Sequence, residues 1–94
     1  MIIHWTAVAR AELYEAWRHI SQDNIEAADR IVQRLQTASL QLSLFPKIGR
    51  SGRRARTREL VVSGTKYILI YRVTQRGVEI LHVRHGRQDW PPKG

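Results

Sequence analysis

The sequence predicts an α+β fold in which a small antiparallel sheet packs against an N-terminal two-helix hairpin, in the order β-α-α-β-β-β. In the first half of the chain, apolar residues recur every three or four positions, which is the period of amphipathic helices. The second half contains runs rich in Val, Ile, Leu and Tyr that are separated by short polar turns, a pattern typical of strands. Because the chain has 94 residues and no cysteine, we expect one domain, residues 1–94, with a modest core and no disulfide.

Two consecutive helices are predicted in the first half. Thr6 is suited to cap a helix over residues 7–20, because its hydroxyl can accept a hydrogen bond from a backbone N–H of the first turn. A second helix is expected over residues 24–46, capped by Ser21 or Asp23. The short connection favours an antiparallel hairpin. The polar face of the first helix is expected to contain Arg10, Glu12, Glu15 and Arg18.

Four strands are predicted, one before the helices at residues 2–5 and three after them at residues 58–62, 67–73 and 78–85. In the run 67–73 both alternating sets of side chains are largely apolar, which indicates a strand buried on both faces. We therefore expect this strand to lie in the middle of the sheet.

Positive charge is concentrated in the second half of the chain. The formal net charge is +8, and residues 47–94 contain twelve basic and three acidic side chains, against four basic and five acidic ones in residues 1–46. Six cations and two glycines lie within the twelve residues 47–58, which we interpret as a mobile basic loop. Such a surface attracts nucleic acid, a nucleoprotein machine or an acidic protein, and the alternative is a solvated basic face without a dedicated partner.

Several classes of function find no support in the sequence. The chain has neither a leader pattern nor an apolar run of the roughly 18 to 20 residues that a membrane span needs, so we expect a cytoplasmic protein without membrane contact. His82 and His85 would point to opposite faces of a strand, so no metal site is expected. The segment 49–52 lacks the Lys-Ser/Thr pair of a phosphate-binding loop, and we expect no cofactor.

The order and spacing of these motifs carry a family resemblance. The segments 58–62 (Arg-Glu-Leu-Val-Val), 67–73 (Tyr-Ile-Leu-Ile-Tyr-Arg-Val) and 78–90 together resemble the C-terminal half of RelE/ParE-type toxins. The preceding segment 45–50, Phe-Pro-Lys-Ile-Gly-Arg, is similar to the turn that these proteins have after their second helix. The resemblance covers nearly the whole chain and depends on order, spacing and length together.

The resemblance implies the toxin of a type II toxin–antitoxin system, neutralised by a tightly bound cognate antitoxin. An acidic, partly disordered C-terminal segment of the antitoxin can fold over the helical hairpin and pair with an exposed sheet edge. Members of the superfamily have two known activities. RelE-like members cleave mRNA in the ribosome without metal, whereas ParE-like members inhibit DNA gyrase and are not known as catalysts. A third possibility is a domain that retains the fold without toxicity.

Metal-independent RNA cleavage requires a base for the 2′-hydroxyl, a cation for the phosphorane and an acid for the leaving oxygen. For a nuclease, the candidates for these roles are His85, Arg84, Arg87 and Glu59. His85 also has a structural interpretation, as a strand-end residue that packs beside Trp90 or bonds a carbonyl. RelE-like nucleases tend to have an Arg where this chain has Ile68, and an apolar side chain cannot hold a phosphate. This departure favours the ParE-like branch.

In the ParE-like interpretation the chain is an inhibitor of an enzyme and needs only a surface that fits a nucleoprotein target. Arg and Trp are the side chains most often found at interface hot spots. The five cations within residues 50–58 repel one another unless an anionic group lies among them. The predicted target-binding residues are Arg50, Arg53, Arg54, Arg56, Arg58, Arg84, Arg87 and Trp90.

Overall fold

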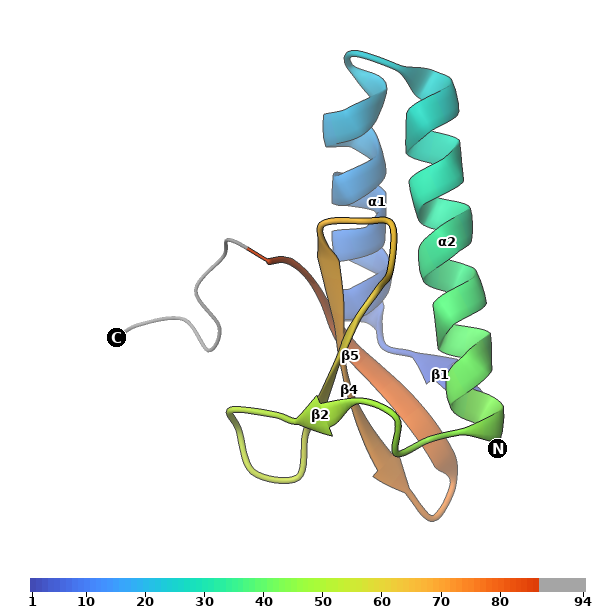
Figure 1. Cartoon of the computed structure of the whole chain (residues 1–94), viewed down its shortest axis with the longest axis vertical. Helices are drawn as coiled ribbons and strands as arrows, with labels where there is room; N and C mark the ends of the chain where they lie inside the picture. The colour runs from blue at the N-terminus through green and yellow to red at the C-terminus, as the bar shows by residue number, and fades with distance from the viewer. Residues whose placement is uncertain (87–94) are drawn as a thin grey trace.

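The computed structural model describes residues 1–86 of the chain. Within them, a first strand leads into two helices, and the other strands follow (Figure 1). The elements are β1 (Ile3–Trp5), α1 (Ala7–Ser21), α2 (Ile25–Leu44), β2 (Arg50–Ser51), β3 (Arg58–Val61), β4 (Tyr67–Thr74) and β5 (Gly77–His85). The predicted α+β class, the helical hairpin and the four predicted strands are confirmed, each strand to within one residue at either end.

The sheet is mixed, which corrects the prediction of a purely antiparallel one. Its strand order is β1-β5-β4-β3-β2, and β1 runs parallel to β5 while the other neighbours are antiparallel. The pairing is fixed at both ends of β1, since Val78 N–H donates to Ile2 O at 2.8 Å and Thr6 N–H donates to Ile80 O at 3.1 Å. Hydrophobic periodicity is the same for both pairing directions, so the pattern locates a strand without encoding its direction.

Both helices begin at side-chain caps. The Thr6 hydroxyl accepts a hydrogen bond from Ala9 N–H at 3.1 Å, as predicted for the start of α1. The second cap is Asn24, whose side chain accepts a first-turn N–H at 2.9 Å, so the prediction of Ser21 or Asp23 is wrong. Because α1 extends through Ser21, the chain reverses after it and Asn24 immediately precedes α2. Neither helix in the described range 1–86 combines the length and apolar character of a membrane span.

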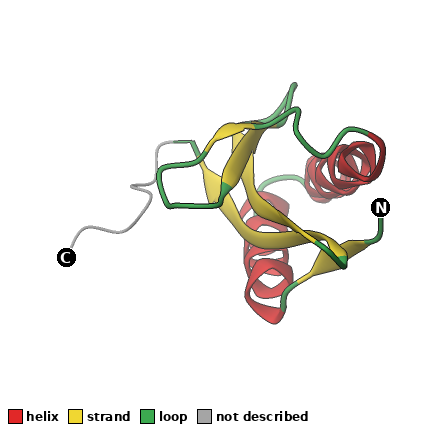
Figure 2. Ribbon diagram, turned by 90° about the horizontal axis from the view of Figure 1, so that it is seen from below, coloured by secondary structure: helices red, strands yellow, loops and turns green. Residues whose placement is uncertain are grey.

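The core lies between the helices and one face of the twisted sheet, which Figure 2 shows from below. β4 is the middle strand, as predicted, and its Leu69 and Tyr71 point into the core. A bulge between Ile70 and Tyr71 shifts the register, so Leu81 of β5 has no partner on β4. The largest side chains that are almost fully buried are Tyr71, Leu35, Leu42, Leu69, Ile70, Ile80 and Val78.

The segment predicted as a mobile basic loop has regular structure over part of its length, which corrects that prediction. It contains β2, which pairs with β3 through the register Arg50 to Glu59 and Ser51 to Arg58. The remaining residues, 52–57, are closed by a hydrogen bond from Gly52 N–H to Thr57 O at 2.7 Å. This closed loop projects from the body at the β2 edge of the sheet, away from the helices (Figures 1 and 2). A two-residue polar strand has no periodic pattern that sequence reasoning can detect.

Candidate functional site

One buried carboxylate holds the basic loop to the sheet. Glu59 of β3 is 3% exposed. Its Oε1 accepts hydrogen bonds from Arg50 Nη2 at 3.0 Å and Nε at 3.3 Å, and its Oε2 accepts from Arg53 N–H at 3.2 Å. Glu59 therefore ties both β2 and the start of the closed loop to β3. It also supplies the anionic group that a cluster of like charges needs.

Tyr71 fastens the base of the loop from the core. Its hydroxyl accepts from Gly49 N–H at 2.9 Å and donates to Pro46 O at 2.7 Å, while the Arg58 guanidinium donates to Gly49 O at 2.9 Å. A Cβ at Gly49 would lie 2.6 Å from this hydroxyl, so the close approach requires glycine. Burial raises the pKa of Tyr71 above its ordinary value of 10.0, against smaller lowering effects of the Gly49 bond and the Arg58 charge. The hydroxyl therefore stays protonated and keeps donating at neutral pH.

A cationic hollow of about 540 Å³ lies in the anchored loop. Lys47, residues 51–58 and Val73 line it, and among the described residues this lining includes no carboxylate. The backbone of the loop is ordered by Thr57, whose hydroxyl donates to Arg54 O at 2.7 Å. Arg56 has a φ of 64°, a left-handed conformation that costs a non-glycine residue roughly 1 to 2 kcal/mol. The cations that line the hollow are Lys47, Arg53, Arg54, Arg56 and Arg58.

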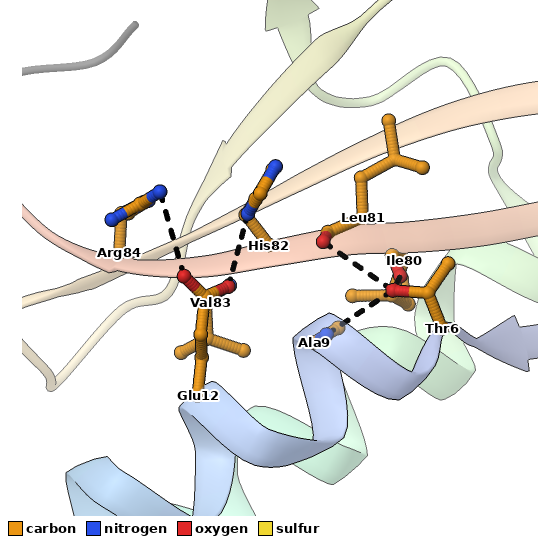
Figure 3. A network of polar contacts seen from close by, with 8 residues as sticks. All are labelled: Thr6, Ala9, Glu12, Ile80, Leu81, His82, Val83 and Arg84. Atoms are coloured by element: carbon orange, nitrogen blue, oxygen red, sulfur yellow. Dashed lines mark hydrogen bonds and ion pairs between the residues drawn. The ribbon is translucent and has the colours of Figure 1, made fainter. Parts of the chain in front are cut away.

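A second polar cluster occupies the edge of β5 beyond the end of β1 (Figure 3). Glu12 of α1 reaches this edge, where its Oε1 accepts from Val83 N–H at 3.1 Å and lies 3.1 Å from His82 Nδ1. Its Oε2 lies 3.5 Å from Arg84 Nη2. The sequence predicted Glu12 only as a residue on the polar face of α1, and the structure directs its carboxylate to β5, where it satisfies a backbone N–H that β1 is too short to pair.

Among the candidate nuclease residues that the structure describes, Glu59 is not brought together with His85. Glu59 and His85 are in register with positions 70 and 67 of β4, and side chains three positions apart on a strand point to opposite faces. The His85 ring packs edge-on against Tyr67 with 5.5 Å between ring centroids, and the predicted packing of His85 beside Trp90 involves a residue outside the described range. Arg84 is engaged by the Glu12 carboxylate.

The predicted target-binding residues fall into three groups. Those that gather at β2, the closed loop and the start of β3 are Arg50, Arg53, Arg54, Arg56 and Arg58. Arg84 lies instead in the Glu12 cluster on β5. Arg87 and Trp90 lie outside the described residues. Sequence reasoning missed Tyr71 and Glu12 as organising residues, since a Tyr in an apolar strand indicates core and a Glu on a helix indicates a solvated face.

An apolar groove of about 620 Å³ lies beside the free edge of β1, and residues of β1, α1 and α2 line it. Tyr14 and Trp17 of α1 stack there with 6.4 Å between ring centroids, and Trp17 Nε1 donates to Asp29 Oδ1 of α2 at 2.8 Å. A groove of this kind next to an unpaired strand edge is suited to an extended or helical segment of a partner.

Residues 3–90 match the family model described as the ParE toxin of the type II toxin–antitoxin system parDE. A Sinorhizobium fredii protein with the provisional name toxin Y4kP is 45% identical over 89 residues, which cover 95% of this chain and 92% of that protein. Toxin RelE2 of Caulobacter vibrioides is 38% identical over 81 residues, which cover 86% of this chain and 90% of that protein. A solved structure of the chromosomal ParDE system from P. aeruginosa matches with a TM-score of 0.77 and 25% identity, covering 90% of this chain and 95% of that one.

The fold and its relatives define a toxin of a type II toxin–antitoxin system. Within that class, the chain belongs to the ParE toxin family. The resemblance to RelE/ParE-type toxins is thereby confirmed, and membership implies an antitoxin as the partner of this protein.

Proposed function

We propose that this toxin inhibits DNA gyrase by binding, without chemistry of its own. The observation that carries the proposal is the match of residues 3–90 to the ParE toxin of parDE, and the likeness to the ParDE structure supports it. The proposed contact surface toward gyrase with its bound DNA is the closed loop with Arg53, Arg54 and Arg56. In this assignment Arg50 and Arg58 hold the shape of the loop through Glu59 and Gly49.

The second candidate function is ribosome-dependent mRNA cleavage, which the similarity to Toxin RelE2 of Caulobacter vibrioides favours. General acid–base cleavage needs the base, the acid and the cation within hydrogen-bond reach of one phosphate. Glu59 and His85 point to opposite faces of the sheet, and the Glu59 carboxylate is buried and already bonded. These placements support the inhibitor over the nuclease.

We further propose that the antitoxin neutralises the toxin by occupying the apolar groove and extending the sheet at β1. β1 is the outermost strand at one side of the sheet that residues 1–86 form, so an added strand can satisfy its outward N–H and C=O groups. Trp17, Tyr14 and Leu13 in the groove provide the apolar contact area that a folding-on-binding segment needs. An acidic segment is also favoured by the net charge of +8.

The test compares supercoiling of relaxed plasmid by purified gyrase with cleavage of a reporter mRNA in a translating extract, each titrated with the purified toxin. The loop variant Arg53→Ala/Arg54→Ala/Arg56→Ala removes three charges from the proposed surface. Its matched control, Arg18→Ala/Arg30→Ala/Arg76→Ala, removes three exposed charges from α1, α2 and the β4–β5 turn. Thermal unfolding by circular dichroism checks that both variants are folded.

We expect the wild type and the matched control to stop supercoiling and leave mRNA intact, and the loop variant to lose at least 10-fold in inhibitory potency, about 1.4 kcal/mol of binding. Cleaved mRNA with normal supercoiling would replace the proposal by the nuclease. Inhibition that the loop and control variants lose equally would remove the loop from the target surface.

A further inference from the structure

We propose that the cationic hollow of the closed loop binds the phosphate backbone of duplex DNA without reading its sequence. The proposal rests on the proposed function, because gyrase acts on duplex DNA, and it names DNA as the part of that target which the loop contacts. The toxin then holds the DNA segment presented by gyrase as well as the enzyme itself.

The charge of the hollow favours phosphate. Five cations line it, and among residues 1–86 its lining includes no acidic side chain. The Glu59 carboxylate is buried and directed to Arg50 and the Arg53 N–H, so it binds the loop from beneath. Arg is the side chain best suited to phosphate, since its planar guanidinium presents a fork of N–H donors.

The loop is held in shape before any ligand arrives. Glu59 anchors its first residues, the Gly52 to Thr57 bond closes it, and the Thr57 hydroxyl bonds Arg54 O. The positive φ of Arg56 places an Arg at the point of the turn where glycine or asparagine is usual. Strained backbone of this kind persists where the surrounding structure holds it, and it clusters at ligand-binding sites.

The same lining residues favour duplex backbone over the other anionic macromolecules. A protein partner would need aromatic or large apolar anchors, and among the described residues that line the hollow only Val73 and Ala55 are apolar. Single strands bind by stacking their bases on aromatic rings, and these lining residues include none. They also include no Asn or Gln to read base edges. What remains is recognition of phosphates alone.

The binding experiment uses fluorescence anisotropy with two labelled duplexes of unrelated sequence and a single strand of equal length. The wild type, the loop variant Arg53→Ala/Arg54→Ala/Arg56→Ala and the matched control Arg18→Ala/Arg30→Ala/Arg76→Ala are titrated at several salt concentrations. If four cations of the hollow each neutralise one phosphate, affinity falls about 100-fold between about 50 and 200 mM salt. The loop variant should bind at least 10-fold more weakly, with a salt slope smaller by about three.

Equal affinity of the wild type for both duplexes, weaker binding of the single strand and retained binding by the matched control support the proposal. Equal losses in the loop variant and the control overturn it in favour of general charge attraction. Tighter binding of the single strand overturns it as well. So does a loop variant that binds duplex normally but no longer captures gyrase subunits free of DNA, which makes the loop a protein contact.

Failure of this proposal is distinguishable from failure of the proposed function. A toxin that inhibits gyrase while its loop variant binds duplex like the wild type keeps the function and loses the DNA site. A toxin that binds duplex through the loop but leaves supercoiling unchanged keeps the DNA site and loses gyrase as the target.

Discussion

Replacing Glu59 by Gln removes the charge that anchors the basic loop while preserving the size of the side chain. The carboxylate accepts from Arg50 at 3.0 and 3.3 Å and from Arg53 N–H at 3.2 Å. The amide keeps one acceptor oxygen but turns its NH2 toward one of these donors. A hydrogen bond to a charged group contributes about 1.5 to 3 kcal/mol. Because the Arg50 side chain is 56% exposed and can be hydrated, we expect a net loss of about 1 to 2 kcal/mol.

The assay is urea unfolding, with Glu79→Gln as the matched control. Glu79 forms an ion pair with Arg72 at 2.6 Å, with side chains 28% and 50% exposed. Exposed pairs contribute about 0 to 1 kcal/mol, so the control should be almost neutral despite its shorter contact. In thermal unfolding of a chain of this length, the expected Glu59→Gln loss lowers Tm by roughly 5 to 15 °C. If Glu59→Gln and Glu79→Gln lose the same free energy of unfolding to within about 0.5 kcal/mol, the anchoring role of Glu59 is refuted.

Glu59→Gln should also change the affinity for DNA, and the direction of that change distinguishes a loop-anchoring role of Glu59 from an effect of its charge alone. Removal of a carboxylate beside a cationic surface strengthens DNA binding through charge alone. If Glu59 holds the loop in its binding shape, Glu59→Gln weakens DNA binding although the net charge becomes more positive. Anisotropy titrations at one salt concentration measure this sign, and tighter binding by the variant would contradict the positioning role.

Further substitutions probe the other structural devices. Tyr71→Phe should cost about 1 to 3 kcal/mol, because it leaves a buried N–H unsatisfied. Burial raises the Tyr71 pKa, so its stabilising effect is complete below pH 10.0 and is lost as pH rises through the raised value. Above pH 10.0 the urea midpoint of the wild type should therefore fall more steeply with pH than the midpoint of Tyr71→Phe. Parallel declines of the two midpoints would argue against a coupling between Tyr71 ionisation and stability. Glu12→Ala should accelerate hydrogen exchange of the Val83 amide, whereas unchanged protection would mean that another group closes the β5 edge. Gly77→Ala should lose more than about 1 kcal/mol, because Gly77 has a φ of 133° and a Cβ there meets the backbone before β1. In Gly86→Ala the nearest atom is 3.4 Å from the new Cβ, so equal losses in the two variants would show that φ and contact are unimportant.

The cationic site was partly predictable, because most of its cations lie close together along the chain. The Arg residues of the segment 50–58 stay near one another in any fold, because the segment is short. Arg84 was grouped with them because of its charge, and the fold places it in the Glu12 cluster instead. Glu59 was a candidate base by residue type, yet its burial and three hydrogen bonds make it an anchor. Residue type limits what a side chain can do, and only its neighbours decide which of these roles it has.

The sequence by itself determined the elements with a repeating local signal. The helical period, the Thr6 cap and the doubly apolar run 67–73 predict α1, α2 and the central strand, because burial of one face imposes its period on the residues. Only the tertiary structure decided the parallel pairing of β1 with β5, the strand β2, and the partners of Glu12 and Tyr71. The β1 pairing and the contacts of Glu12 and Tyr71 join residues distant along the chain, and a hydrogen bond between two such groups leaves no periodic trace in either segment. The strand β2 pairs with nearby residues, but its two polar residues are too few to show a period.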